Sequence, residues 1–140
     1  MSRLFWLLCL GAWIQGEPAR ISEIKEEAVR DKKYVAVYFC GSDWCRSCLQ
    51  FKSETLALPE VEGLLRERFV WYTADFPQHK KLDRQTVETN EFLAEKLNPQ
   101  GIFPVLVIAD TEWTVKARIL KKEGPQSALE QLKAWRYVHE

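Results

Sequence analysis

The stretch YVAVYFCGSDWCRSC, residues 34–48, passes from an apolar run through a short polar turn to a pair of cysteines. Tyr34–Cys40 is uninterrupted and rich in β-branched and aromatic residues, which favours a central strand covered on both faces. The Gly-Ser-Asp of residues 41–43 is typical of a turn, and a helix is expected to begin near Cys45. Cys45 and Cys48 therefore lie where a buried strand turns into a helix.

Strand and helix patterns continue on both sides of this stretch. Further strands are expected at Val70–Asp75, Pro104–Ala109 and Val115–Ile119. Helical spacing of apolar residues occurs in residues 17–33, 45–59, 87–97 and 127–138, with a further helical segment through Phe69. The residues expected on the buried faces of these helices are Ile21, Ile24, Ala28, Val29, Leu49, Phe51, Leu56, Leu58, Val87, Phe92, Leu93, Leu97, Ala128, Leu129, Leu132, Trp135 and Val138.

The order of these elements predicts the fold class. Strands joined by a helix pair in parallel, whereas the two strands joined by the short turn Asp110–Glu112 pair antiparallel. The chain is therefore expected to form an α/β fold with a central mixed β-sheet of about four strands and helices on both faces.

Length and charge limit the range of functions. A chain of 140 residues is sufficient for one buried core and short for two. Lys plus Arg and Asp plus Glu number 20 each, and no basic stripe occurs, so nucleic acid is not expected as a partner. The short basic segment His79-Lys80-Lys81 is interpreted as a solvated loop.

The N-terminal segment differs from the rest of the chain. Arg3 precedes Leu4–Ile14, an uncharged run that is too short to span a membrane and has the length of a signal-peptide core. Gly16 offers a small residue for cleavage. We therefore interpret residues 1–16 as a signal peptide and residues 17–140 as the exported domain, located in the periplasm or secreted.

The placement of the cysteine pair has a chemical consequence. Unpaired N–H groups and the dipole at the start of a helix stabilise an anion, so the Cys45 thiol is expected to have a lowered pKa. Cys45, exposed at the helix tip, would attack a substrate disulfide, and Cys48, deeper and one turn further, would resolve the mixed disulfide. Cys40 would remain as a third, buried cysteine, whereas Cys9 would be lost with the signal peptide.

The two residues between the cysteines, Arg46 and Ser47, are expected to tune this pair. A guanidinium next to Cys45 favours the thiolate, while the carboxylate of Asp43 opposes it. Stabilising the thiolate makes the disulfide more oxidising. Because the two charges oppose each other, the sequence leaves reductase, oxidase and isomerase open.

Phe39–Cys48 resembles the redox motif of the thioredoxin superfamily, and its Gly-Ser-Asp-Trp-Cys-x-x-Cys pattern is most similar to exported bacterial thioredoxin-like proteins of the Dsb type. Gly101–Val105, just before an expected strand, matches the family's cis-proline loop in position. The resemblance covers roughly residues 34–136.

The resemblance implies a thioredoxin-like fold and a thiol–disulfide oxidoreductase that exchanges disulfides with exported proteins through Cys45 and Cys48. It also implies that Trp44 packs beside the redox pair, that Pro104 is cis, and that the backbone of Phe103 binds an extended substrate segment. The expected partners are protein disulfides or dithiols and a membrane or soluble redox protein that recycles the cysteines. A monomer is expected, with no cofactor and no metal.

One departure of the sequence from the family concerns an acidic residue. Many thioredoxins carry a buried acidic residue in the strand before the motif, but residues 35–39, Val-Ala-Val-Tyr-Phe, contain none. Tyr38 is the side chain expected nearest to the second cysteine. The group that removes the proton from Cys48 is therefore left open.

Two other functions fit the same residues. Because soft metals favour thiolates, Cys45 and Cys48, joined by Cys40 and His79, would form a copper or zinc site. The second alternative is a redox-inert thioredoxin-like binding module, although the presence of both cysteines argues against it. An iron–sulfur cluster is disfavoured, since the spacing Cys40-x4-Cys45-x2-Cys48 requires a fourth cysteine downstream and the sequence shows none after Cys48.

The export hypothesis predicts that residues 1–20 carry a reporter out of the cytoplasm. We expect a fusion of this segment to a reporter that is active only outside the cytoplasm to give signal. The matched control replaces Leu7 and Leu8 with Arg, which interrupts the apolar run and should abolish the signal. A wild-type fusion that stays in the cytoplasm would contradict the interpretation.

Overall fold

A computed structural model describes residues 16–135, and residues 1–15 and 136–140 lie outside the described part. The signal-peptide prediction, except for Gly16, and the expected burial of Val138 therefore fall outside the described residues. The elements are α1 (Ala19–Asp31), β1 (Tyr34–Cys40), α2 (Arg46–Phe51), the π-helical turn η1 (Lys52–Leu56), α3 (Pro59–Arg68), β2 (Phe69–Asp75), α4 (Arg84–Leu97), β3 (Val105–Ala109), β4 (Val115–Leu120), the 3-10 turn η2 (Lys121–Glu123) and α5 (Gly124–Ala134).

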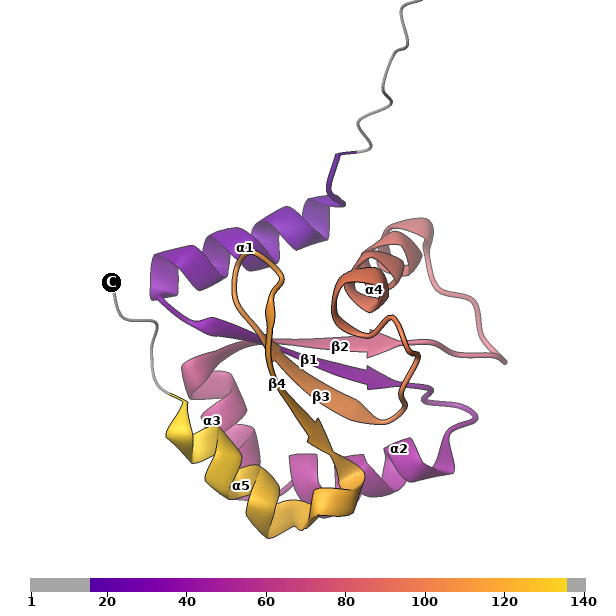
Figure 1. Cartoon of the computed structure of the whole chain (residues 1–140). Helices are drawn as coiled ribbons and strands as arrows, with labels where there is room; N and C mark the ends of the chain where they lie inside the picture. The colour runs from indigo at the N-terminus through magenta and orange to yellow at the C-terminus, as the bar shows by residue number, and fades with distance from the viewer. Residues whose placement is uncertain (1–15, 136–140) are drawn as a thin grey trace, which may run out of the picture.

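The four strands form one mixed sheet in the order β2-β1-β3-β4. β1 pairs in parallel with β2 and antiparallel with β3, and β3 pairs antiparallel with β4. Helices α1 and α4 lie on one face of the sheet, and α2, α3 and α5 lie on the other (Figure 1). The predicted α/β architecture, a central mixed sheet with helices on both faces, is confirmed.

Strand β1 is the centre of both hydrophobic cores. Val35, Val37 and Phe39 are fully buried against α1 and α4, while Ala36 and Tyr38 are buried on the face that carries α2, α3 and α5. Successive side chains of a strand point to opposite faces, so a strand covered on both sides must be apolar at every position. This is the reason for the uninterrupted apolar run in the sequence.

Several apolar residues expected on buried helix faces are exposed. These are Val29, Leu49, Leu58 and Val87. In α1 the buried residues are Ile21, Ile24 and Ala28, and Val29 lies ~100° further round the helix, toward solvent. The stripe that packs inward is thus narrower than the apolar spacing alone indicated.

The helix expected over residues 45–59 is interrupted by a wider turn. The backbone N–H of Ala57 donates to the carbonyl of Lys52 at 2.8 Å, five residues earlier. In a continuous α-helix Phe51 and Leu56 would project about 140° apart, whereas a π-helical turn brings residues five apart close to one face. Both side chains are buried, so the wider turn satisfies the core on this side of the sheet.

The last helix begins earlier than the pattern indicated. It starts at Gly124 with Pro125 in its first turn and ends at Ala134. Trp135 follows the helix and is half-buried, with its ring 4.9 Å from that of Tyr34 at the start of β1. Within residues 16–135, no helix has both the length and the apolar character needed to cross a membrane.

Candidate redox site

The chain leaves β1 at Cys40 and reaches Cys45 through a tight turn, residues 41–45, which we call the redox turn. Cys45 occupies the N-cap position of α2 with an extended backbone, at φ −92° and ψ 96°. Its Sγ accepts the backbone N–H of Cys48 at 3.2 Å. The same N–H also donates to the Cys45 carbonyl at 3.1 Å, so it is shared between the two acceptors. Its contact with the Cys45 sulfur, at the start of the helix, would stabilise a thiolate.

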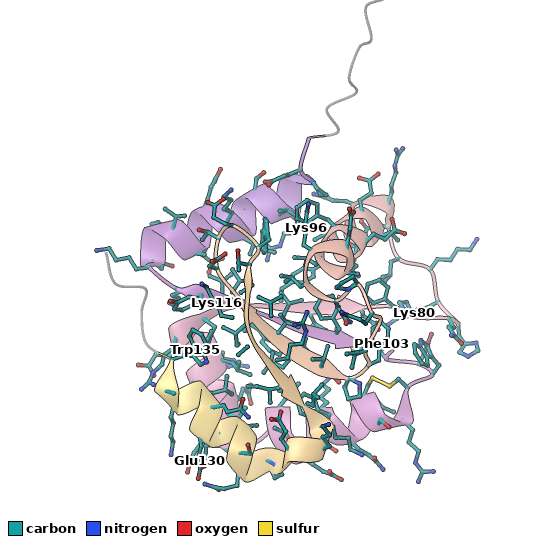
Figure 2. The ribbon with its side chains drawn as sticks, viewed as in Figure 1. Lys80, Lys96, Phe103, Lys116, Glu130 and Trp135 are labelled. Carbon is teal, nitrogen blue, oxygen red and sulfur yellow. A yellow bond between two sulfur atoms is a disulfide. The ribbon has the colours of Figure 1, made fainter. Side chains whose placement is uncertain are left out.

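Cys45 and Cys48 form a disulfide, with their Cα atoms 5.2 Å apart. It is the yellow bond in Figure 2 and lies at the same end of the sheet as Phe103. Cys45 is 7% exposed and Cys48 1%. The predicted order of depth is correct, but Cys45 is less exposed than expected, because its side chain joins the core cluster on this face of the sheet.

Trp44 covers the redox turn. Its indole Nε1–H donates to the carbonyl of Phe76 at 2.7 Å, and 41% of the residue remains exposed. The indole lies directly over Gly41, where an added Cβ would overlap the ring. Gly41, which sequence reasoning treated only as a turn residue, is therefore required by the close approach of Trp44.

The loop before β3 comes to the same place. The Phe103–Pro104 peptide bond is cis, the isomer that the resemblance implied. The side-chain amide of buried Asn98 both donates to and accepts from the backbone of Ile102, at 2.9 and 3.0 Å, which fixes the loop. The Phe103 ring lies 5.9 Å from the Trp44 ring, edge to face. The structure thus brings Trp44, the cysteine pair and Phe103 together.

Tyr38 is in contact with the second cysteine, as expected. Its hydroxyl donates to the backbone carbonyl of Cys48 at 2.7 Å. Burial raises the pKa of Tyr38 far above its ordinary value. The phenol therefore stays protonated near neutral pH and acts there as a hydrogen-bond donor rather than a base.

The third cysteine, Cys40, lies beside an acidic residue that sequence reasoning missed. Its Sγ is 3.7 Å from Oδ1 of Asp75, which also accepts the backbone N–H of Ser42 at 2.8 Å. Burial, with the nearby Asp75 charge, raises the pKa of the Cys40 thiol to about 12. Asp75 could have been found by aligning the ends of the two parallel strands, because it pairs directly with Cys40.

Asp43 does not stand beside Cys45 as a free surface charge. Its two carboxylate oxygens accept the backbone N–H groups of Gln78 and His79, each at 2.8 Å. The hydrogen bond from Gln78 is the main reason that the pKa of Asp43 is lowered. The backbone of the predicted solvated loop is therefore fastened to the redox turn, whereas Arg46 and Ser47 are exposed at the start of α2.

A cavity of about 560 Å³ opens beside Cys48, between α2, η1 and α3 and the neighbouring strand β2. Cys40, Lys52 and Asp75 are among its lining residues.

Within residues 16–135, no three His, Cys, Asp or Glu side chains are grouped so that they could hold a metal ion. Cys40 contacts Asp75, and Cys45 and Cys48 are bonded to each other, so the geometry offers no support for the metal-binding alternative.

The fold and the CxxC disulfide at a helix start, with a cis-proline loop beside it, define a thioredoxin-like protein. A family model described as thioredoxin-like matches residues 13–111, and the chain belongs to that family. Among characterised relatives, it is 29% identical over 107 residues to the disulfide bond reductase DsbH of Chlamydia pneumoniae. That alignment covers 76% of this chain and 64% of the relative, so the chain spans less than two thirds of the relative's length.

Solved structures agree with this assignment. A DsbH oxidoreductase matches with a TM-score of 0.72 and 25% identity, covering 81% of this chain and 78% of the other. The oxidised C-terminal domain of DsbD from Neisseria meningitidis matches with a TM-score of 0.56 and 22% identity, covering 84% and 94%. The second likeness supports the fold alone.

The contrast between Cys40 and an ordinary thiol predicts a difference in alkylation. In the Cys45→Ser/Cys48→Ser variant, where Cys40 is the remaining thiol of the described residues, the folded protein should react with iodoacetamide very slowly at pH 8. The raised pKa of the buried thiol keeps it protonated at pH 8, whereas a free cysteine, with a pKa of ~8.5, is partly ionised at that pH. Mass spectrometry of the Cys40 peptide measures the rate, and the same protein unfolded in guanidinium chloride is the control. Equal rates in both states would contradict the assignment.

Proposed function

We propose that this protein is a thiol–disulfide oxidoreductase that exchanges disulfides with exported proteins, with Cys45 as the nucleophile and Cys48 as the resolving thiol. The observation that carries the proposal is the disulfide at the start of α2, in which the Cys45 Sγ accepts the backbone N–H of Cys48. The same N–H can support a thiolate once the pair is reduced. Cys48 is more deeply buried, as a group that reacts only with Cys45 requires.

The reduced pair would act in two steps. The Cys45 thiolate attacks one sulfur of a substrate disulfide, forming a mixed disulfide and releasing the other sulfur as a thiolate. The Cys48 thiolate then attacks the Cys45 sulfur, which restores the Cys45–Cys48 disulfide and releases the second substrate thiolate. Two electrons pass to the substrate, and each released thiolate takes up a proton. A dithiol donor must then reduce the pair again.

The substrate would bind across the loops that flank the disulfide. Trp44, Ile102 and Phe103 present apolar surface there, and Trp44 and Ile102 are the more exposed. The loop ending in the cis bond before Pro104 is held by Asn98 and offers the Phe103 backbone to an extended segment. Arg46 and Ser47, exposed at the helix start, are proposed to tune the pair.

The direction of electron flow is proposed to be reduction of the substrate. The support is the likeness to a relative named as a disulfide bond reductase. We further propose that the protein works in the periplasm or is secreted, is monomeric, and is recycled by a membrane or soluble redox partner. The Leu4–Ile14 run supports export.

Substitution of each cysteine should separate the two steps. With dithiothreitol as reductant, Cys45→Ser should abolish catalysed reduction of insulin, because no nucleophile remains. Cys48→Ser, reduced and then freed of dithiothreitol before insulin is added, should instead accumulate a mixed disulfide through Cys45, detectable on a non-reducing gel. Cys40→Ala is the matched control and should keep turnover within about threefold. Full activity in Cys45→Ser would refute the assignment of the nucleophile.

A further inference from the structure

Three consecutive residues of the redox turn are bonded to one segment of chain, the residues that end β2 and begin the loop before α4. The Ser42 N–H and hydroxyl donate to the Asp75 carboxylate at 2.8 and 2.5 Å. Asp43 accepts from Gln78 and His79, and the Trp44 indole donates to Phe76, as described above. We call residues 75–79 the clamp segment. Its contacts leave the turn before Cys45 little freedom to move.

The clamp segment is itself well anchored. The backbone N–H of Phe76 donates to the carbonyl of Cys40 at 2.8 Å. The side-chain amide of Asn90, which is 2% exposed on α4, donates to the carbonyl of Asp75 at 2.8 Å. The turn is therefore fastened to a part of the structure that is held by β1 and α4.

The clamp segment also reaches the cis-proline loop. The Phe76 ring lies 5.6 Å from the Phe103 ring, and Phe103 lies against Trp44. The redox turn, the clamp segment and the loop before β3 therefore form one continuous rim around the disulfide. A change in the clamp segment would therefore alter both parts of the proposed substrate surface, the redox turn and the loop before β3.

Three residues of the redox turn make five hydrogen bonds to the clamp segment. Two of these bonds are made by the charged side chain of Asp43, two residues before Cys45. The carboxylate accepts two backbone N–H groups, which are strong hydrogen bonds because the acceptor is ionised. These bonds fix the segment that sets the position of Cys45 relative to the first N–H groups of α2.

We propose that Asp43 is a positioning residue of the redox site: by fastening the redox turn to residues 78 and 79, it holds Cys45 where the backbone N–H of Cys48 reaches its sulfur, and so sustains the thiolate. This inference rests on the proposed function. It reverses the sign expected from charge alone, since a carboxylate near Cys45 would by itself disfavour the thiolate.

The opposite signs make the inference testable. If Asp43 acts by position, Asp43→Ala should raise the measured pKa of the Cys45 thiol. Alkylation at pH 6.5 should then be slower by about two- to tenfold, which corresponds to the net contribution of one hydrogen bond. Asp43→Asn keeps one acceptor oxygen and should show a smaller effect. If Asp43 acts by charge, both variants should lower the pKa equally.

Two further variants complete the design. Asp43→Glu keeps the charge but displaces the carboxylate. It should raise the Cys45 pKa if Asp43 acts by position, and leave that pKa unchanged if Asp43 acts by charge. This variant decides between the two roles if Asp43→Ala does not fold. Asp83→Ala is the matched control. Asp83 also binds protein donors through both oxygens, the N–H and hydroxyl of Thr86 at 2.9 and 2.6 Å, but at the start of α4. It should leave Cys45 reactivity unchanged.

The measurement is the rate of alkylation of the reduced protein against pH, followed at the Cys45 peptide by mass spectrometry, and it needs no substrate. A low wild-type pKa with unchanged or lowered values in the Asp43 variants would overturn this inference and leave the proposed function in place. A wild-type Cys45 that titrates near the ~8.5 of free cysteine would overturn both.

Discussion

The site depends on where β1 ends. The strand is buried on both faces, so its register is fixed by the two cores. It ends at Cys40, at the end of the sheet where the redox turn begins. Five residues later the chain enters α2 with Cys45 at the N-cap. A shift of one residue in β1 would exchange the side chains of the two cores. The position of the nucleophile is therefore tied to the most strongly determined element of the fold.

The parallel pairing of β1 with β2 contributes the second part of the site. Because the two strands run in register from Tyr34 opposite Phe69 to Cys40 opposite Asp75, their following loops emerge side by side. The acidic group that many thioredoxins place in the strand before the motif is absent there, and Asp75 on the neighbouring strand engages Ser42 and Cys40 instead. Polar support for the redox turn thus comes from across the strand pair.

The sequence was most informative where one physical requirement dominates. The apolar run of β1, the cysteine spacing and the strand after Pro104 follow from burial and local backbone chemistry, and the structure contains each of them. The exposure of Val29 and Leu49, the π-helical turn after Phe51 and the partners of Asp43 were not predictable in that way. They depend on how elements distant in sequence pack, which periodicity does not encode.

The proposed function requires Cys45 and Cys48 to form a reversible redox couple rather than a structural disulfide, and the reduction potential of the pair distinguishes the two. Equilibration of the protein in glutathione buffers, with the oxidised fraction measured after acid quenching and thiol labelling, gives that value. We expect a reversible two-electron transition within the range of thioredoxin-fold proteins, about −270 to −120 mV. A disulfide that stays oxidised to below about −300 mV, as structural disulfides do, would contradict it.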